Sequence, residues 1–168
     1  GYEVLVYNRT ASKCEPVTEL GATMVKHPSE MAARNPDVIC INVTATEDVE
    51  QVLFSDTGVA SGAKKGLTIV DHSTISPDAT QAFAKRLERY GVSLVDAPVS
   101  GGDTGARNGT LSIMVGGPDE AVRRVWPMFE EVGKTITHVG ETGAGQACEA
   151  CNQVAVAGAP AVACEALA

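Results

Sequence analysis

The chain has 168 residues, of which 44% are hydrophobic and 20% charged, the balance of an ordinary globular α/β protein rather than of a disordered or repetitive one. Its apolar runs fall short of the roughly 18 residues that a membrane span requires, and 21 Asp and Glu against 13 Lys and Arg give a net charge of −8 that disfavours binding to nucleic acid. Five cysteines, an odd number with no signal peptide ahead of them, favour a reducing compartment. We therefore expect a cytoplasmic protein without a membrane or nucleic-acid partner.

Strand and helix signals alternate along the chain. Short runs rich in β-branched residues, bounded by turn signals, predict strands over residues 3–7, 37–43, 67–71, 93–99, 111–115 and 135–139. Helices are predicted between them, over residues 29–34 and 46–54, from Ser76-Pro77-Asp78 to Gly91, from Pro118, and from Gly143 onward. Because neighbouring parallel strands need a long crossover connection, this alternation predicts a doubly wound, mostly parallel sheet with helices on both faces, the Rossmann-type α/β class.

The first predicted strand ends at Asn8-Arg9-Thr10. In a dinucleotide-binding fold the residue at the end of the second strand meets the adenosine ribose, where an acidic side chain selects NAD and a nearby arginine accommodates the 2′-phosphate of NADP. Here the position holds a neutral amide followed by a guanidinium, which can bind a phosphate with two hydrogen bonds. The alternative is a solvated turn in which Thr10 caps a helix.

The glycine-rich fingerprint of dinucleotide-binding proteins, Gly-x-Gly-x-x-Gly after a first strand, is absent from the sequence. Gly143-Ala144-Gly145 lacks the third glycine. If residues 1–7 already form the second strand, the phosphate-binding turn precedes residue 1. We therefore expect a fragment of a longer protein.

A glycine-rich segment follows the strand predicted over residues 93–99. Residues 96–102 read DAPVSGG, and small residues in such a loop let backbone N–H groups approach an anionic ligand closely. This segment resembles the substrate-binding signature of the β-hydroxyacid dehydrogenases, a family that includes 3-hydroxyisobutyrate dehydrogenase and the tartronate semialdehyde and glyoxylate/succinic semialdehyde reductases. The resemblance extends over nearly the whole chain.

This resemblance implies an NADP-dependent oxidoreductase that reduces a small semialdehyde or 2-oxo acid to a hydroxy acid. It assigns residues 1–140 to an incomplete NADP-binding Rossmann domain and residues 141–168 to the start of a long helix that leads to an all-helical domain. It also implies a small-molecule carboxylate substrate and a homo-oligomer in the full-length form. By position in the family motifs, cofactor binding falls to Asn8, Arg9, Thr10, Val43, Thr44 and Thr74, substrate binding to Ser100, Gly101 and Gly102, and catalysis to Glu149 and Asn152.

One position departs from the family pattern. Residues 140–152, GETGAGQACEACN, resemble the motif G-x-x-G-x-G-x-x-x-K-x-x-N, but Glu149 stands where that motif has its catalytic lysine. In the family this lysine protonates the carbonyl oxygen as hydride arrives, a proton transfer worth roughly 10²–10⁴ in rate, whereas an ionised glutamate has no proton to give. Three explanations stay open: an engineered or sequencing change, a natural loss of catalysis, or a carboxyl that burial keeps protonated.

Two further interpretations follow from this departure. A non-catalytic NADP-binding or interaction protein would keep the fold without the acid, and an imine reductase is consistent because such relatives also carry other residues at this position. Cys148 and Cys151 form a C-x-x-C pair, but without a second pair or a nearby histidine a metal site is disfavoured. In the family's sheet the absent first strand is central, so its two neighbours are expected to have unpaired edges that promote association.

Overall fold

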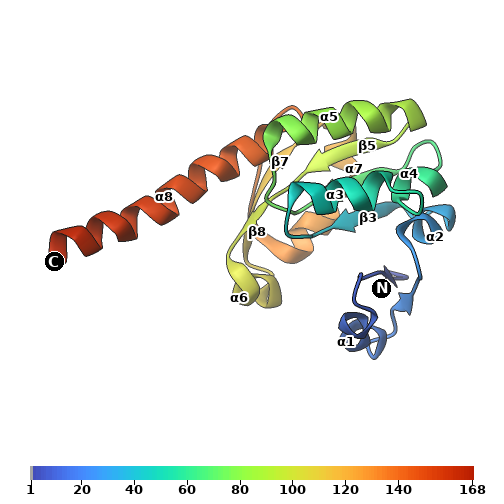
Figure 1. Ribbon diagram of the computed structural model, residues 1–168, viewed down its shortest axis with the longest axis horizontal. Coiled ribbons are helices and arrows are strands. Elements are labelled where there is room, and N and C mark those ends of the chain that lie inside the picture. The colour runs from blue at the N-terminus through green and yellow to red at the C-terminus, as the bar shows by residue number, and fades with distance from the viewer. Residues whose placement is uncertain (1) are drawn as a thin grey trace.

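The computed structural model describes residues 2–168, and its centre is a six-stranded sheet (Figure 1). Strands β3, β4 and β5 are parallel, as are β7 and β8, whereas β7 runs antiparallel to β5 and β6. This confirms a mostly parallel α/β sheet of the Rossmann type. In spatial order the strands are β3 (Val38–Ile41), β4 (Thr68–Asp71), β5 (Ser93–Asp96), β7 (Leu111–Gly116) and β6 (Val99–Ser100), with β8 (Gly133–Gly140) paired to β7.

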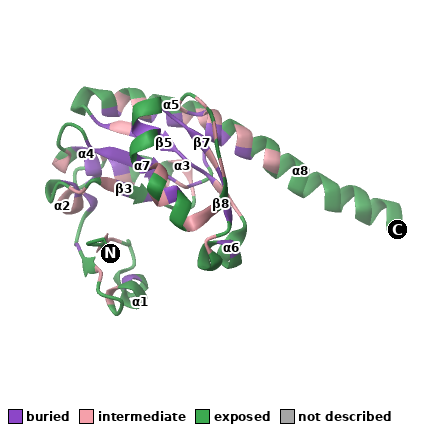
Figure 2. Ribbon diagram, turned by 180° about the vertical axis from the view of Figure 1, so that it is seen from behind, coloured by how far each residue is buried: buried purple, intermediate pink, exposed green. Residues whose placement is uncertain are grey.

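Helices cover both faces of this sheet. Neighbouring residues of β4 point to opposite faces: Ile69 packs in one apolar cluster with Leu53 and Phe83, and Val70 packs in another with Phe129. The strands between the two helical layers are the most buried part of the chain (Figure 2). The helices of the first cluster are α2 (Pro28–Ala33), α3 (Thr46–Phe54), α4 (Val59–Gly62) and α5 (Pro77–Leu87), and the helix of the second is α7 (Asp119–Val132).

The N-terminal segment forms a separate two-stranded sheet. Strand β1 (Leu5–Val6) pairs in parallel with β2 (Thr23–Met24), and η1 (Ala11–Cys14) and α1 (Glu15–Thr18) connect them. Figure 1 shows this part in blue beneath the main body. Within residues 2–168, β1 pairs only with β2 and β3 only with β4, so each leaves one edge open, as the resemblance led us to expect.

The strand predicted over residues 93–99 is divided into β5 and β6. The Ala97 N–H still extends the β5 ladder by donating to the Asp71 carbonyl at 2.8 Å. Pro98 cannot continue the ladder because it has no N–H, and its carbonyl accepts a hydrogen bond from the Met114 N–H of β7. Beyond Pro98 the chain continues along the same edge of β7, where Val99 pairs with Ile113 in the register set by Asp96 and Gly116, while β8 occupies the other edge of β7.

The predicted helix signals are largely confirmed. Ser76 caps α5 by accepting a hydrogen bond from the Ala79 N–H, and Gly91, with φ +68°, ends the 3₁₀ turn η2 (Glu88–Tyr90) that follows α5. Helix α3 has the predicted bounds, whereas α2 begins at Pro28, one residue earlier than expected, because proline is favourable in the first turn. The loop after β6 enters α6 (Gly102–Asn108).

The last helix, α8 (Ala144–Leu167), projects away from the sheet (Figure 1). Its first turns pack against α5, β5, β7 and β8, where Gly145, Gln146 and Glu149 are buried. Beyond Asn152 the helix is exposed on all sides (Figure 2). Across residues 2–168, the helices fall short of the combination of length and apolar character that a bilayer crossing demands.

Candidate cofactor and substrate site

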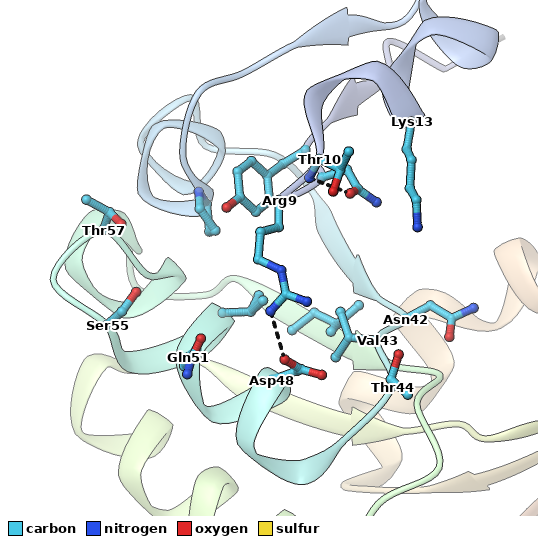
Figure 3. Close-up of a pocket in the computed structure, with 15 residues that line it drawn as sticks. Arg9, Thr10, Lys13, Asn42, Val43, Thr44, Asp48, Gln51, Ser55 and Thr57 are labelled. Atoms are coloured by element: carbon cyan, nitrogen blue, oxygen red, sulfur yellow. Dashed lines mark hydrogen bonds and ion pairs between the residues drawn. The ribbon is translucent and has the colours of Figure 1, made fainter.

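A cavity of about 560 Å³ lies at the carboxyl ends of β1 and β3 (Figure 3). Its walls come from the segment after β1, the segment after β3 and helix α3. In open α/β sheets ligands bind outside the carboxyl ends of the strands, so this is the expected place for a cofactor. Five of the predicted cofactor residues line the cavity: Asn8, Arg9, Thr10, Val43 and Thr44.

The side chain of Asn8 stabilises the turn that follows β1. The Thr10 N–H donates to Oδ1 of Asn8 at 2.9 Å, which is an Asx turn. Thr10 stands at the N-cap of η1, but its hydroxyl makes no capping hydrogen bond. The Thr10 hydroxyl therefore does not cap the helix, which was the alternative interpretation. Thr10 lines the cavity, where its hydroxyl can donate and accept hydrogen bonds.

Arg9 reaches across the mouth of the cavity. Its Nη1 lies 3.3 Å from Oδ1 of Asp48 on α3, and its side chain is 82% exposed (Figure 3). An exposed ion pair of this kind contributes little to stability, so the guanidinium can exchange its partner at small cost. The sequence interpretation did not include Asp48, since no local pattern connects α3 to the end of β1.

Lys13 is a second cation at the same cavity and was also missed from the sequence. It lies three residues after Thr10, one helical turn along η1, and this spacing was the signal that could have found it. Together the cavity offers a guanidinium, an ammonium and several amides and hydroxyls, opposed by the single carboxylate of Asp48. This donor set fits a phosphate group.

The loops that follow β3, β4 and β5 are bonded to one another. The Val43 N–H donates to Oγ of Ser73 at 2.9 Å, and Nδ1 of His72 donates to the Ala97 carbonyl at 2.8 Å. Burial lowers the pKa of His72, which favours the neutral ring. Thr74 is exposed in the loop after β4 and does not line the cavity, although the parallel strands bring it to the same edge of the sheet.

The predicted substrate loop lies at the start of α6. Ser100 is half-buried, while Gly101 and Gly102 are exposed and have φ values of +132° and +59°. Both glycines are required by the backbone of the turn itself, since other residues rarely adopt these angles. A Cβ on Gly101 would also approach the Leu111 side chain to 3.2 Å. None of the three residues lines the cavity.

Glu149 and Asn152 face each other on α8. Glu149 is 1% exposed, and Nδ2 of Asn152 donates to its Oε2 at 3.2 Å. Gln153, which the sequence interpretation left out, donates through Nε2 to the other carboxylate oxygen. No ion pair among residues 2–168 involves Glu149. Two neutral amides on its own helix thus provide the hydrogen bonds to the Glu149 side chain, and one of them belongs to Asn152, the other residue that the resemblance assigns to catalysis.

Metal ligands do not gather near α8. The thiols of Cys148 and Cys151 are free, and no three His, Cys, Asp or Glu side chains in the described part of the chain are placed to hold a metal ion. The polar groups at the carboxyl edge line a cavity where open α/β sheets bind their ligands. An open, mostly parallel sheet with a cavity at this edge is typical of the class of dinucleotide-binding domains.

Comparison with known families agrees with this class. Residues 1–140 match the family described as the NAD binding domain of 6-phosphogluconate dehydrogenase, and the chain belongs to this family. It therefore has a nicotinamide-dinucleotide-binding domain.

Individual relatives confirm the resemblance drawn from the motifs. The chain is 47% identical over 143 residues to the 2-hydroxy-3-oxopropionate reductase of Escherichia coli K12, a match that covers 85% of this chain and 49% of the relative. Among solved structures, 3-hydroxyisobutyrate dehydrogenase of Mycobacterium tuberculosis with L-serine superposes with a TM-score of 0.87 at 31% identity, over 94% of this chain and 53% of that one. Psf3 in complex with NADP+ and 2-OPP gives 0.89 at 29% identity, over 99% and 60%. The chain spans about half the length of the curated relatives it matches.

Proposed function

We propose that the chain carries the NADPH-binding part of a reductase that converts 2-hydroxy-3-oxopropionate, or a similar short semialdehyde or 2-oxo acid, into a hydroxy acid. The observation that carries this proposal is the cavity lined by Arg9 and Lys13, with the neutral Asn8 where NAD-selective proteins place an acid. Similarity to the Escherichia coli reductase supports the substrate class, since that relative is named for 2-hydroxy-3-oxopropionate.

Each group of residues has a role in this proposal. Bound NADPH supplies the hydride. The chain's own residues hold its adenosine end, pass along its length and hold the substrate carboxylate beside its reactive ring. Phosphate binding falls to Arg9, Thr10 and Lys13, contact along the cofactor to Val43, Thr44 and Thr74, and the substrate carboxylate to Ser100, Gly101 and Gly102.

In this proposal the residue at position 149 supplies the proton that the carbonyl oxygen of the substrate receives. Reduction of an aldehyde adds hydride to the carbonyl carbon and a proton to the carbonyl oxygen, and an ionised carboxylate cannot donate that proton. It also repels an anionic substrate, by about 1 kcal/mol for charges roughly 4 Å apart in water and about 4 kcal/mol at an effective dielectric of 20. We therefore expect turnover with Glu149 to be impaired.

A second candidate is a binding protein that kept the cofactor site and lost catalysis. It is favoured by the contact between Glu149 and Asn152, since the buried carboxylate engages the amide that the reductase would turn toward its substrate. Both candidates predict NADPH binding, so they differ only in turnover.

Turnover of the full-length protein separates the two candidates. NADPH oxidation is measured with 2-hydroxy-3-oxopropionate, glyoxylate and succinic semialdehyde for the protein with Glu149, for Glu149→Lys, and for Glu149→Gln as the matched neutral control. We expect Glu149→Gln to recover only what the charge repulsion costs, and Glu149→Lys to exceed Glu149→Gln in kcat/KM by at least roughly tenfold, because only lysine supplies the proton. NADPH binding without a gain from lysine would refute the acid role and favour the binding protein. Turnover of a cyclic imine alone would replace the reductase proposal with imine reduction.

A further inference from the structure

Gln146 is a buried amide that holds the loop containing Thr74. Its side chain is 1% exposed, its Nε2 donates to the Ser73 carbonyl at 2.6 Å, and its Oε1 accepts from the Ile75 N–H at 3.0 Å. A carbonyl only accepts and a backbone N–H only donates, so the orientation of this amide is fixed by its partners. The two hydrogen bonds fix the backbone at Ser73 and Ile75, on either side of Thr74.

The same residue is fixed to the end of β5 by its main chain. Asp96 is fully buried, and its two carboxylate oxygens accept from the Gln146 N–H at 2.9 Å and from the Gly143 N–H at 2.7 Å. Free N–H groups at a helix start need such partners, and Gly143 at the N-cap of α8 has no side chain to provide one. Asp96 thus fixes the start of α8 to the sheet, and burial raises the pKa of this carboxyl.

At Gly145 helix α8 lies so close to the sheet that there is no room for a side chain. A Cβ on Gly145 would lie 2.4 Å from the Met114 carbonyl oxygen and 2.8 Å from Oδ2 of Asp96. Glu149 follows Gln146 by three residues and Gln153 by seven, a spacing that places all three on one side of the helix. The placement of α8 at Gln146 therefore also sets the placement of Glu149 and Asn152.

We propose that Gln146 is a positioning residue, which sets the placement of Thr74 on the cofactor side relative to Glu149 and Asn152 on α8. A residue needed only for packing would be replaced without loss by an apolar side chain of similar length. The amide instead satisfies one donor and one acceptor of the same loop, and an unpaired buried group there would cost stability and release the loop. This inference rests on the proposed reductase function.

The test uses the full-length protein with Glu149→Lys as the parent, because that change is expected to give measurable turnover. Gln146→Met removes both hydrogen bonds at similar length. We expect kcat to fall by roughly tenfold to a hundredfold, with KM for NADPH nearly unchanged, because misplaced reacting groups affect the chemical step. Hydrogen exchange at the Ile75 amide should become roughly tenfold faster. Val125→Ala, on the buried face of α7, controls for stability and should lower Tm without lowering kcat.

Gln146→Glu adds a readout that packing alone would not change. Its carboxylate still accepts from Ile75 but cannot donate to Ser73 until it is protonated. We expect its kcat relative to the parent to be low at neutral pH and to recover as pH falls.

Two results would overturn the inference: a normal kcat in Gln146→Met, or unchanged exchange at Ile75. The absence of turnover in the Glu149→Lys parent would instead overturn the proposed function, and the exchange rate of the Ile75 amide would still decide whether Gln146 holds the loop.

Discussion

Asp71, the last residue of β4, tests how the carboxyl edge of the sheet is built. Its side chain is fully buried, its Oδ1 accepts from the Ser73 N–H at 2.9 Å, and its Oδ2 has no partner among the described residues. Asp96 is its neighbour in register on β5. Burial, to which the charge of Asp96 adds, raises the pKa of Asp71 from 3.8 to about 6 despite the hydrogen bonds from Ser73.

This raised pKa makes stability depend on pH in a definite direction. The unfolded chain releases the Asp71 proton near pH 3.8, whereas the folded chain retains it to about 6. The stabilisation is therefore fully present below the unfolded pKa and is lost as pH rises through the folded one. The difference between 3.8 and about 6 corresponds to about 3 kcal/mol in full, of which about 1.4 kcal/mol is lost between pH 5 and pH 8.

Asp71→Asn isolates this effect because it keeps the size of the side chain and an oxygen for Ser73 but cannot ionise. We expect its free energy of unfolding to gain about 1.4 kcal/mol on wild type between pH 5 and pH 8. Burial also lowers the pKa of His72 and raises that of Asp96, and both proteins keep these groups. Because the charges of Asp71 and Asp96 interact, the difference between the proteins reports on Asp71 together with its coupling to Asp96.

Urea unfolding at the two pH values measures this difference. It is followed by the fluorescence of Trp126, a partly buried residue of α7 whose ring lies 6.3 Å from that of Phe129. The chain is kept at submicromolar concentration, and the midpoint is checked for independence of concentration. A stability difference that is the same at both pH values would refute the reasoning.

Three more predictions concern the cofactor, the helix and the open strands. Arg9→Ala should weaken NADPH binding by roughly tenfold and NADH binding much less, by calorimetric titration, and equal losses would count against a contact to the 2′-phosphate. Gly145→Ala should lower the free energy of unfolding by about 1–3 kcal/mol, because the added Cβ meets the Met114 carbonyl and the Asp96 carboxylate. Gly158→Ala, on the exposed part of the same helix with nothing within 4 Å, should raise it by up to about 1 kcal/mol, and similar effects of both changes would be inconsistent with this packing. At micromolar concentration the 168-residue chain should associate through the open edges of β1 and β3, and a monomer in light scattering throughout would contradict this.

Local signals predicted the elements of the fold well. The apolar runs at residues 37–43 and 67–71 became β3 and β4, since strands covered on both faces read as continuous hydrophobic segments. The Ser76 cap and the Gly91 stop were also visible, because each acts within one turn of the chain. The break at Pro98 and the antiparallel direction of β7 were not, because they depend on which strand the chain meets next.

The candidate site was predicted only where it follows a contiguous motif. Asn8, Arg9 and Thr10 were found from their place at the end of a strand, and they line the cavity. Asp48 and Gln146 were missed. The partner of Asp48 is 39 residues away in the sequence, and the partners of Gln146 are 50, 71 and 73 residues away. No periodic sequence pattern connects positions that far apart. Tertiary structure alone brings these groups together.

A crystal structure of the full-length protein with NADP+ tests the central claim most directly. The account predicts the 2′-phosphate within hydrogen-bond distance of Arg9 and Lys13, with the nicotinamide ring at the edge of the sheet between Thr74 and the loop of Ser100. A cofactor bound with its phosphate elsewhere, or an empty cavity at saturating NADP+, would contradict it.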